Sequence, residues 1–575
     1  MRISHFRIAV LGALWAFSSS SSAQVNVWQV DGPAAGDALG WAMCSIDDQD
    51  GDSVRDIVVG APRSDFSGPN SGSVYVLSGA TGAVLRRVDG VNNGELLGQA
   101  LAPVNDVNGD GISDWIAGAP FASVGTSKNG RAEVRSGADG TLLIEVVGVE
   151  AFGLAGTAVA GTGDGNGDGV PDIVVGAPNE DANGTDSGSV TVYSGATGGY
   201  IRGHTGMNPG DQLGTSLLGI SDITGDGIDD YAAGTPYGSN GLGYLQVHSG
   251  ATGANLYTLI GPELDAGFAR VICALGDANS DGLADIAIGS PDSSLGGIDA
   301  GMVSVISAST GGTIRLITGQ PGEHLGRSVA DAGDWDGDGV SDLLVGGLVA
   351  GTTGMVRVYS GADGSLLAST SGQTGDQEAG SALAGDFDID GDGRSEFVLG
   401  DKLADSGGQD SGLARSYSSH NLLGVPYCFG SSLATCPCGN TGGPTTGCRN
   451  SSLAGGLLDI AGSASVSADD LALLALQLLP GKAALALVGS ESVNGGNGSP
   501  FGDGLRCAGG VVQGLGVRIP GASGSATWGP GLSGQVNWDS GDARFFQVLY
   551  RDSQVGGPCG LGFNLTNGVQ VSFLP

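Results

Sequence analysis

Histidine is almost absent from this 575-residue chain. The five histidines are His5, His204, His248, His324 and His420, and none stands in a motif with a nucleophile. The chain also has neither a GxSxG elbow nor an HExxH zinc motif. We therefore predict no catalytic residue. Because His248 stands where other copies of a repeat described below have tyrosine, we expect it to serve packing.

Positive charge is also scarce. The chain has 23 lysines and arginines against 60 aspartates and glutamates, which gives a formal net charge of −37. Nucleic acids and anionic membranes are bound by clustered lysines and arginines. The composition therefore argues against both as partners.

Long apolar runs are lacking except near the start of the chain. Arg2 and Arg7 precede an apolar stretch at Ile8–Phe17, and a serine-rich segment ends at Ala23. This order is typical of a secretory signal peptide, so we predict that residues 1–23 are cleaved off and that the mature chain is secreted or lies at the cell surface. The next most apolar segment, Leu471–Val488, is interrupted by Pro and Gly and predicts a pair of strands around a turn rather than a membrane span.

What the chain has in abundance is one acidic loop, repeated seven times. Each copy spans nine residues, carries acids at alternating positions among glycines, and is followed by a short apolar stretch. The final acids of successive copies are 54 to 58 residues apart. A repeat of about 50 residues predicts a propeller or a solenoid rather than separate domains.

Each loop offers oxygen atoms suited to a hard cation. Positions one, three, five and nine carry acids, amides or, once, a threonine, and position seven offers a backbone carbonyl. Ca²⁺ accepts six to eight oxygens in a flexible shell, whereas Mg²⁺ demands a near-ideal octahedron and keeps its waters. We therefore predict up to seven Ca²⁺ sites, one per loop. The predicted ligands are Asp48, Asp50, Asp52, Val54 and Asp56; Asp106, Asn108, Asp110, Ile112 and Asp114; Asp164, Asn166, Asp168, Val170 and Asp172; Asp222, Thr224, Asp226, Ile228 and Asp230; Asp277, Asn279, Asp281, Leu283 and Asp285; Asp334, Asp336, Asp338, Val340 and Asp342; and Asp388, Asp390, Asp392, Arg394 and Glu396.

Two loops depart from the common pattern. Position six is glycine in the other copies, where it permits a sharp turn, but it is Ser53 in the first loop, so we expect strain there. Thr224 replaces an acid or amide at position three of the fourth loop. We expect that loop to be the weakest cation site.

An EF-hand is the obvious alternative for such a loop, but it requires a glutamate at position twelve between two helices. Position twelve is apolar in every copy, from Val59 in the first to Leu399 in the last. The residues after each loop are strand-like, for example Ile57–Val59. The loops are therefore predicted to join β-strands.

The repeat resembles the FG-GAP repeats of integrin-alpha-like β-propellers. The matching features are a Leu-Gly before most loops, such as Leu39–Gly40, the loop itself, and a Gly-Ala-Pro after it, such as Gly60–Pro62. The last two copies lose the proline. The resemblance covers about residues 25–420 and implies a seven-bladed propeller. The resemblance indicates the fold but does not select one function, because the repeat serves adhesion receptors, lectin-like proteins and some enzymes.

The chain ends of this propeller are expected to meet. Val25–Gly32 reads as a strand with no blade before it, and the seventh copy stops after Tyr417 without a fourth strand. If they share a blade, no sheet edge is left exposed. The acidic loops and the Ala-Thr-Gly turns would then lie on one face. The loops after Gly-Ala-Pro and the crossovers would lie on the other face, where integrin-like propellers bind partners.

Six of the eight cysteines follow the propeller. In a secreted protein they predict disulfides, with 15 possible pairings, and a zinc site at Cys436–Cys438 is the alternative. Cys44 and Cys273 take the place of alanines before the first and fifth loops, so we expect buried, unbridged side chains. Residues 421–575 are predicted to form a smaller β-sandwich-like domain. This region resembles a cysteine-containing module of secreted proteins from planctomycete-like bacteria. Cell-surface attachment or oligomerisation is the hypothesis for its role.

Taken as a whole, the sequence predicts an all-β protein: a signal peptide at 1–23, a seven-bladed β-propeller at 24–420, and a disulfide-containing β-sandwich-like domain at 421–575. The leading hypothesis for function is a secreted, calcium-dependent binding or adhesion module for a protein or glycan ligand. A polysaccharide lyase or hydrolase on a similar propeller is the runner-up, and a structural component of the cell envelope is the third. Only Phe121 and Tyr237 place an aromatic after the proline, which argues against a lectin.

Overall fold

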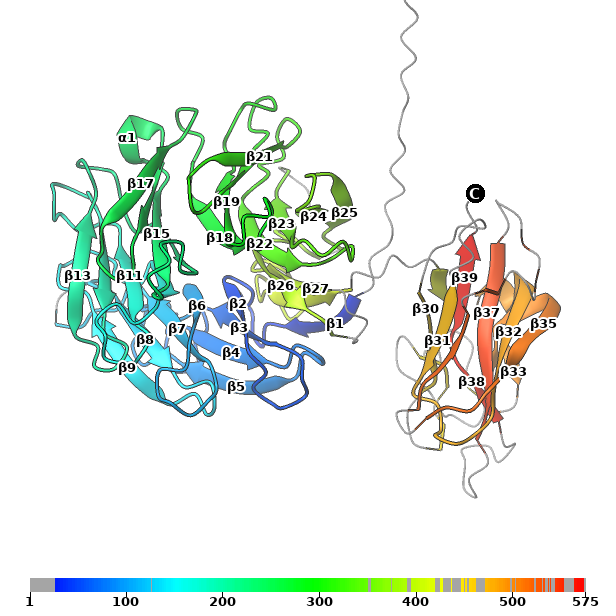
Figure 1. Ribbon diagram of the computed structural model, residues 1–575. Coiled ribbons are helices and arrows are strands. Elements are labelled where there is room, and N and C mark those ends of the chain that lie inside the picture. The colour runs from blue at the N-terminus through cyan, green and yellow to red at the C-terminus, as the bar shows by residue number, and fades with distance from the viewer. Residues whose placement is uncertain are drawn as a thin grey trace, which may run out of the picture. The chain divides into compact units, whose positions relative to one another are not determined.

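In the computed structural model the chain folds into two compact units (Figure 1). The first contains the described residues 26–418, without 126, 350–352, 374 and 390–394. The second is described at 424–427, 436, 446–448, 450–451, 455–461, 471–496, 499–501, 503–521, 524–529, 531–532, 536, 538, 543–552 and 563–572. The predicted signal peptide, residues 1–23, lies outside the described residues. Among the described residues no helix has the length and apolar character needed to cross a bilayer.

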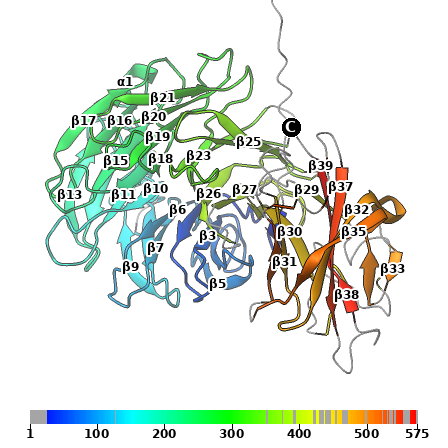
Figure 2. The ribbon, with the colours of Figure 1, turned by 45° about the vertical axis from the view of Figure 1, so that its right-hand side comes forward.

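The first unit consists of seven antiparallel sheets, each of four strands, arranged as a propeller (Figures 1 and 2). This confirms the predicted all-β, seven-bladed fold. In chain order the blades are β2 (Met43–Ile46), β3 (Asp56–Ala61), β4 (Ser73–Leu77), β5 (Val84–Asp89); β6 (Ala100–Val104), β7 (Asp114–Ala119), β8 (Arg131–Arg135), β9 (Leu142–Val147); β10 (Ala158–Gly161), β11 (Ile173–Ala177), β12 (Ser189–Tyr193), β13 (Tyr200–Thr205); β14 (Ser216–Ile220), β15 (Asp230–Thr235), β16 (Tyr244–His248), β17 (Asn255–Ile260); β18 (Val271–Leu275), β19 (Asp285–Ser290), β20 (Met302–Ile306), β21 (Thr313–Thr318); β22 (Ser328–Gly333), β23 (Asp342–Gly347), β24 (Met355–Tyr359), β25 (Leu366–Ser371); and β26 (Ala382–Phe387), β27 (Glu396–Asp401), β28 (Leu413–Tyr417) with β1 (Asn26–Asp31). A single helical turn, α1 (Gly238–Gly241), interrupts the fourth blade.

The two ends of the propeller share its seventh blade, as predicted. β1 pairs antiparallel with β28, with Gln29 opposite Arg415 and Asp31 opposite Leu413. The Nε1–H of Trp28 on β1 also donates a 2.8 Å hydrogen bond to the carbonyl of Gly79 in the first blade. The N-terminal strand therefore contacts both the seventh and the first blade, and it closes the ring between them.

Blades are packed against one another by buried apolar side chains. The second strand of each blade lies between two neighbouring sheets, which is why β3, β7 and β19 are buried along their whole length and read as nearly continuous apolar segments. One cluster joins Ile46 and Val58 of the first blade to Trp115 and Ala117 of the second. The hydrophobic core is thus a ring of interfaces between blades.

Outer strands add polar contacts between blades. Side chains on the fourth strands donate to backbone carbonyls in the turn of the following blade, at the same structural position as Trp28. Arg86 donates to Ala138, Arg202 to Gly250 at 2.5 Å, Tyr257 to Ala308 at 2.5 Å and Arg315 to Ala362. Arginine or tyrosine side chains thus link four further pairs of neighbouring blades by the same kind of hydrogen bond that Trp28 makes.

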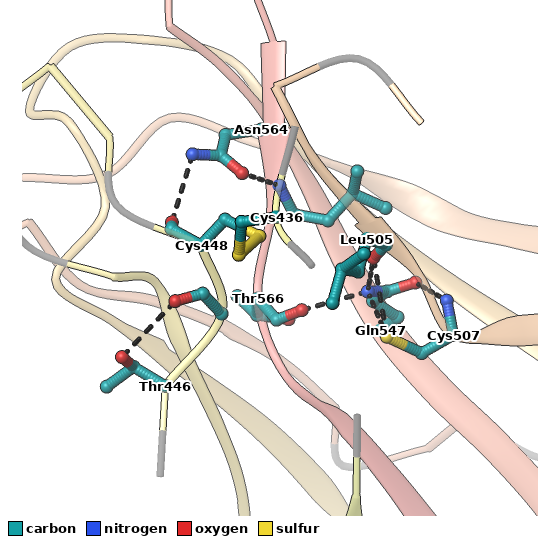
Figure 3. Close-up of a disulfide and its surroundings, with 10 residues drawn as sticks. Cys436, Thr446, Cys448, Leu505, Cys507, Gln547, Asn564 and Thr566 are labelled. Atoms are coloured by element: carbon teal, nitrogen blue, oxygen red, sulfur yellow. Dashed lines mark hydrogen bonds between the residues drawn. A yellow bond between two sulfur atoms is a disulfide. The ribbon is translucent and has the colours of Figure 1, made fainter. Parts of the chain in front are cut away.

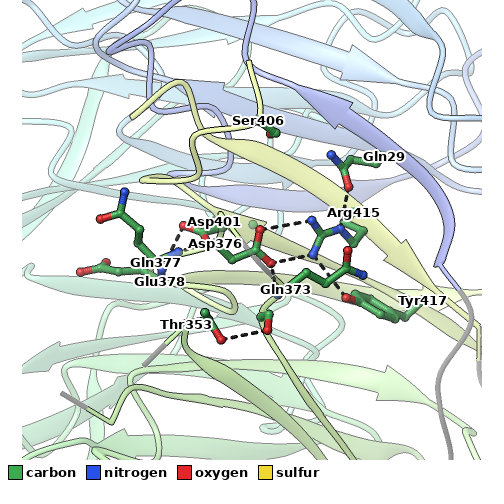
Figure 4. A network of polar contacts seen from close by, with 12 residues as sticks. Gln29, Thr353, Gln373, Asp376, Gln377, Glu378, Asp401, Ser406, Arg415 and Tyr417 are labelled. Atoms are coloured by element: carbon green, nitrogen blue, oxygen red, sulfur yellow. Dashed lines mark hydrogen bonds and ion pairs between the residues drawn. The ribbon is translucent and has the colours of Figure 1, made fainter. Parts of the chain in front are cut away.

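Buried acids at the start of the crossovers were not predicted. Asp37, Glu95, Asp211, Glu323 and Asp376 occupy equivalent positions, and all are at most 9% exposed. Each accepts a hydrogen bond from a backbone N–H of its own crossover, at 2.5–3.1 Å. Figure 4 shows the last of them: Arg415 binds both oxygens of Asp376, at 2.7 and 3.2 Å, and also contacts Gln29 of β1.

The second unit is a β-sandwich, as predicted. One sheet runs β29 (Gly424–Tyr427), β39 (Gly568–Ser572), β37 (Ala543–Arg551), β32 (Ala484–Ser492) and β35 (Ala508–Arg518), with β38 (Phe563–Leu565) beside β37. The other contains β30 (Leu457–Ala461), β31 (Ala472–Leu476) and β36 (Ala526–Trp528), and a hairpin joins β33 (Ser499–Phe501) to β34 (Gly504–Arg506). A short 3-10 turn, η2, spans Val493–Gly496. Leu458 and Leu473 of one sheet pack with Phe546 and Val571 of the other in a single core.

One expectation about this unit was wrong. The strands on either side of Pro480 and Gly481 exist, as β31 and β32, but they do not pair with each other. They belong to the two different sheets, because the apolar side chains of both are buried in the space between the sheets. The Pro-Gly turn carries the chain from one sheet to the other.

The three described cysteines of this unit are disulfide-bonded. Cys436 and Cys448 are bonded to each other, with Cα atoms 5.8 Å apart (Figure 3). Cys507 is also disulfide-bonded. The zinc alternative at Cys436 is therefore wrong, because its sulfur is used in the disulfide. Cys428, Cys438 and Cys559 lie outside the described residues. Buried Gln547 links the strands nearby, donating to the carbonyls of Leu505 and Thr566 at 2.7 and 2.8 Å.

Candidate metal centres and binding face

The seven acidic loops join the first and second strands of their blades, so all emerge on one face of the propeller. Each described loop bends through two left-handed residues, at positions four and six. Position six has φ between 87° and 89° where it is glycine, and Ser53 takes a φ of 73° in the first loop. Position four is also left-handed, and in the fifth loop it is Ser280, with φ 62°. Ser280 is therefore held in a left-handed backbone conformation like Ser53, and the sequence interpretation missed it.

The acid at position one holds the loop in shape. Asp48 accepts hydrogen bonds from the backbone N–H groups of Gly51 and Ser53, at 2.6 and 2.8 Å. The same pattern recurs at Asp106, Asp164, Asp222 and Asp334. The hydrogen bond from the N–H of Gly227 lowers the pKa of Asp222. Neighbouring donors add to this effect, and together they outweigh burial, which acts in the opposite direction.

The acid at position nine is buried and ties the loop to its blade. Asp56 is fully buried, and its two oxygens accept hydrogen bonds from Gln49 N–H at 2.6 Å and Gly79 N–H at 3.0 Å. Burial raises the pKa of this carboxyl to about 6 despite those donors, and the same holds for Asp172, Asp285 and Asp342. Because burial disfavours the charged form of such a carboxyl, a cation bound beside it would stabilise the carboxylate.

Carboxylate oxygens converge most closely in two of the loops. Asp48, Asp50 and Asp56 of the first loop, and Asp334, Asp336 and Asp338 of the sixth, each offer oxygens within 4.8 Å of one another. These loops both carry aspartate at position three. All donors are carboxylate oxygens, which fit a hard cation such as Ca²⁺ rather than a soft one.

In three other loops, position three is asparagine, whose amide donates to the acids around it. Asn108 donates to Asp110 at 2.8 Å, and Asn279 donates to Asp281 and Asp285 at 3.0 and 3.1 Å. Asn166 donates to Asp172 at 3.3 Å. In these loops the NH₂ group thus occupies part of the space that a cation would take.

The fourth and seventh loops complete the set. Thr224 donates from its hydroxyl to Asp222 at 3.2 Å. Of the seventh loop, Asp388 and the buried Glu396 are described, whereas Asp390, Asp392 and Arg394 lie outside the described residues. The backbone carbonyls at position seven stay a prediction.

A cavity of about 570 Å³ runs along the first strands of all seven blades. Arg55 and Asp386 form a 2.7 Å ion pair within its lining, and nearby Asp331 has a pKa raised to about 7, chiefly by burial. Cys44 and Cys273 also line this cavity as free thiols, which confirms that they are unbridged. They are half-buried rather than buried, because the innermost strands expose an edge to the channel. Burial nevertheless raises the pKa of Cys44 to about 12.

His248 packs as expected. Its ring stacks on that of His204 with centroids 4.0 Å apart, and both lie near Tyr231, whose hydroxyl contacts Nε2 of His204 at 2.6 Å. The side chain of His248 is 3% exposed, and burial lowers its pKa to about 3. A neutral, buried imidazole of this kind serves the interface between the third and fourth blades.

The face opposite the acidic loops carries exposed apolar side chains. They lie in the loops after the second strands and in the crossovers of blades one to five, and none occurs in the described loops of blades six and seven. The set comprises Phe66, Val91, Val124, Val149, Phe152, Met207, Tyr237, Leu264, Leu295 and Ile298, with exposed fractions from 38% to 83%. We call these ten residues the apolar face.

Comparison with known proteins agrees with this architecture. The family described as "FG-GAP repeat" matches residues 39–77, 155–193 and 268–306, which lie in the first, third and fifth blades. The propeller is of the FG-GAP, integrin-alpha-like type. The chain is 28% identical to integrin alpha-V of Gallus gallus over 206 residues, which are 33% of this chain and 20% of that protein. It is 33% identical to integrin alpha pat-2 of Caenorhabditis elegans over 224 residues, 34% of this chain and 18% of that protein.

The matched segments thus span only about a fifth of the length of those relatives. Among solved structures, the chain is similar to a crystal structure of BBS1N in complex with ARL6DN, soaked with lead, with 11% identity and a TM-score of 0.43 over 68% of this chain and 96% of that one. The resemblance of residues 424–575 to the module of planctomycete-like bacteria stays a prediction.

Proposed function

We propose that this chain is a secreted, calcium-dependent binding module that docks an extracellular partner through the apolar face. The integrin-alpha similarity supports a non-enzymatic binding propeller of the cell exterior. The acidic clusters support divalent cations in the loops. In this proposal Ca²⁺ occupies up to seven loops through the residues predicted from the sequence, and it acts as a structural ion.

The observation that carries the proposal is the set of ten exposed apolar side chains in the loops and crossovers opposite the acidic loops. The other exposed large apolar side chains of the propeller, such as Val84 and Leu316, lie on outer strands. Val149 is 83% exposed and Ile298 is 77% exposed, although both belong to a protein with ample polar residues for its surface. Large apolar side chains that gather on one face of a protein are typical of an interaction site.

The test is partner capture from an extracellular or envelope extract, with the calcium-loaded full chain immobilised. The double variant Val149→Ser with Ile298→Ser should lose a captured protein. The matched control is Val84→Ser with Leu316→Ser, which removes similarly exposed apolar side chains from outer strands. Equal capture by both double variants would count against the apolar face as the docking site.

One observation favours the second candidate, a polysaccharide lyase or hydrolase. Asp331 lines a cavity large enough for a sugar ring, and its pKa of about 7 would suit a general acid. Asp331→Asn would then abolish the release of reducing ends from a polysaccharide while leaving capture intact. Release of no sugar by the wild-type chain across acidic, neutral and sulfated polysaccharides would remove this candidate.

A further inference from the structure

A cluster of positive charge lies on the same face as the apolar residues, near the start of the innermost strands. Arg63 and Lys402 both lie over the ring of Trp41, at 5.2 and 4.6 Å from its centroid. Lys402 also reaches Glu378 at 3.2 Å, and the same carboxylate oxygen binds Arg327 at 2.9 Å. We call these five residues the rim cluster.

The rim cluster brings three blades together. Trp41 lies two residues before the start of β2 of the first blade, and Arg327 directly precedes β22 of the sixth. Lys402 directly follows β27 of the seventh blade, and Glu378 lies in the crossover that leads to that blade. The innermost strands begin on this face, so the cluster stands at the hub of the propeller, away from the acidic loops.

The cluster holds more positive than negative charge. It contains three cations and one carboxylate, and a single oxygen of that carboxylate serves both Arg327 and Lys402. Buried Asp401 adjoins the cluster and accepts a hydrogen bond from the N–H of Glu378 at 3.0 Å, so cations still outnumber carboxylates by three to two. Among the described residues, no carboxylate lies within ion-pair distance of Arg63. Such an excess is unusual in a chain of net charge −37, where acids outnumber bases by more than two to one. Arg327 is 36% exposed and Lys402 is 21% exposed, so both can still be reached from solvent.

We propose that the rim cluster binds carboxylate side chains of the partner protein, so that the docked segment is acidic. This deepens the function proposed above and rests on it. Arg63 would supply a free guanidinium for a bidentate contact, and Lys402 and Arg327 would each gain the second acceptor that Glu378 cannot provide. Charge complementarity of this kind sets orientation and association rate, while the neighbouring apolar residues supply contact area.

A protein segment fits the surface better than a sugar does. Trp41, the aromatic ring of the rim cluster, is already contacted by two cations, Arg63 and Lys402. This ring is therefore less available to stack on a sugar. Phe66, 50% exposed, belongs to the same loop as Arg63, so this loop carries both an apolar and a positive side chain. That combination fits a segment of mixed acidic and apolar side chains.

The probe is fluorescein-labelled decaglutamate, with decaglutamine as the neutral reference, titrated against the calcium-loaded full chain at low and high salt. The wild-type chain should bind decaglutamate, and added salt should weaken that binding. The double variant Arg63→Gln with Lys402→Gln should raise Kd by about tenfold. The charge-conserving variant Arg63→Lys with Lys402→Arg keeps both charges and one guanidinium, so it should bind decaglutamate more tightly than the double glutamine variant.

The matched control is Lys128→Gln with Arg87→Gln. It removes the same two charges, and Lys128 and Arg87 also lie over aromatic rings, at 5.1 and 3.7 Å. Decaglutamate binding by this control should change less than about twofold. An equal loss in both double variants would mean unspecific attraction and would overturn the proposal, as would no binding of decaglutamate by the wild-type chain.

Two further outcomes would also overturn it. Binding that survives the rim variants but disappears in EDTA would place decaglutamate on Ca²⁺ at the acidic loops. Binding of a heparin-like sulfated glycan that depends on Arg63 and Lys402, without binding of decaglutamate, would assign the cluster to an anionic glycan. The capture experiment with the Val149 and Ile298 variant is independent of all these results, so the proposed function can stand where this inference fails.

Discussion

At the scale of single residues, the acidic loops are shaped by two left-handed positions and one capping acid. Position six is visible in the sequence as a recurrent glycine. Position four is equally demanding, yet Ser280 fills it in one loop, just as Ser53 fills position six in another. For a non-glycine residue the left-handed conformation costs about 1–2 kcal/mol. Both serines therefore store strain that a substitution can release.

We expect Ser53→Gly to stabilise the protein. The relief of about 1–2 kcal/mol is partly offset by the greater freedom of glycine in the unfolded chain, about 0.5–1 kcal/mol. The net gain should be about 1 kcal/mol, measured by urea unfolding in EDTA. Ser45→Gly on β2, where φ is not positive, is the control and should destabilise. A loss of stability from Ser53→Gly would contradict the strain.

Asparagine at position three should weaken calcium binding relative to aspartate. In the second loop the Asn108 amide donates to Asp110, and a bound cation must displace that donor. Asn108→Asp should raise the calcium affinity of its loop severalfold, and it should lower stability in EDTA because a fourth carboxylate then repels its neighbours.

Asp50→Asn in the first loop is the reciprocal change and should do the opposite on both counts. Calorimetric titration and thermal melts with and without calcium measure the two effects. If both substitutions shifted calcium affinity in the same direction, the asparagine donors would not be competing with the ion.

At the scale of elements, the crossovers depend on buried acids that the sequence interpretation passed over. These acids recur like the loop ligands, but their partners differ from blade to blade. Arg131 pairs with Glu95 at 3.0 Å, Tyr244 donates to Asp211 at 3.0 Å, and Arg415 binds Asp376 (Figure 4). The Arg415 contact is, however, repeated in the sixth blade, where Arg357 binds Glu323 at 2.9 Å, and each of the two arginines also contacts a tyrosine hydroxyl. Acid and arginine lie more than 30 residues apart in sequence, so only the packed blades reveal the pairing.

We expect Arg415→Met to be strongly destabilising, because it leaves Asp376 buried without a counterion. Both side chains are 3% exposed, and removal of one partner of such a pair costs about 3–5 kcal/mol. The double variant with Asp376→Asn should cost less than the sum of the single changes. Urea unfolding in excess calcium measures all three.

The exposed pair of Arg270 and Asp292, 50% and 39% exposed, serves as the comparison. Arg270→Met should cost no more than about 1 kcal/mol. Similar losses for Arg270→Met and Arg415→Met would show that burial of the ion pair at the crossover contributes nothing special.

At the scale of the whole molecule, the calcium loops should link stability to both metal and pH. Asp56, Asp172, Asp285 and Asp342 have folded pKa values near 6, raised by burial. Without metal, these carboxyls bind protons in the folded state between about pH 4 and pH 6, where the unfolded chain has released them. Their contribution to the free energy of unfolding therefore falls as pH rises through that window.

We predict that the melting temperature in EDTA is higher near pH 5 than at pH 7.5. Calcium should raise it at pH 7.5 and reverse this trend, because the bound ion requires the deprotonated carboxylates, so acidification releases it. Below about pH 4, stability should fall in either condition, since acids with lowered pKa values such as Asp222 then lose their hydrogen-bonded charge.

Thermal melts from pH 3.5 to pH 7.5, in EDTA and in excess calcium, measure this dependence. A melting temperature in EDTA that rose steadily from pH 5 to pH 7.5 would contradict the raised pKa values. An unchanged melt on addition of calcium would contradict the metal sites themselves.

The sequence by itself determined the elements of the propeller and their number. The period of the acidic loops fixed seven blades, apolar alternation placed strands such as β4 and β12, and the orphan strand before residue 32 indicated closure with Tyr417. These features are local or periodic, so they can be recognised in the amino-acid sequence. A candidate ligand set for each loop could be proposed for the same reason, since all its members lie within nine residues.

The tertiary structure decided everything that depends on residues from different blades. It assigned β31 and β32 to separate sheets, placed Cys44 and Cys273 along a channel, and gathered the apolar face and the rim cluster from distant loops. Trp41 and Lys402 are about as far apart in sequence as the propeller allows, and they meet only because the ring closes. Contacts of that kind follow from the packing of the blades, which no local pattern records.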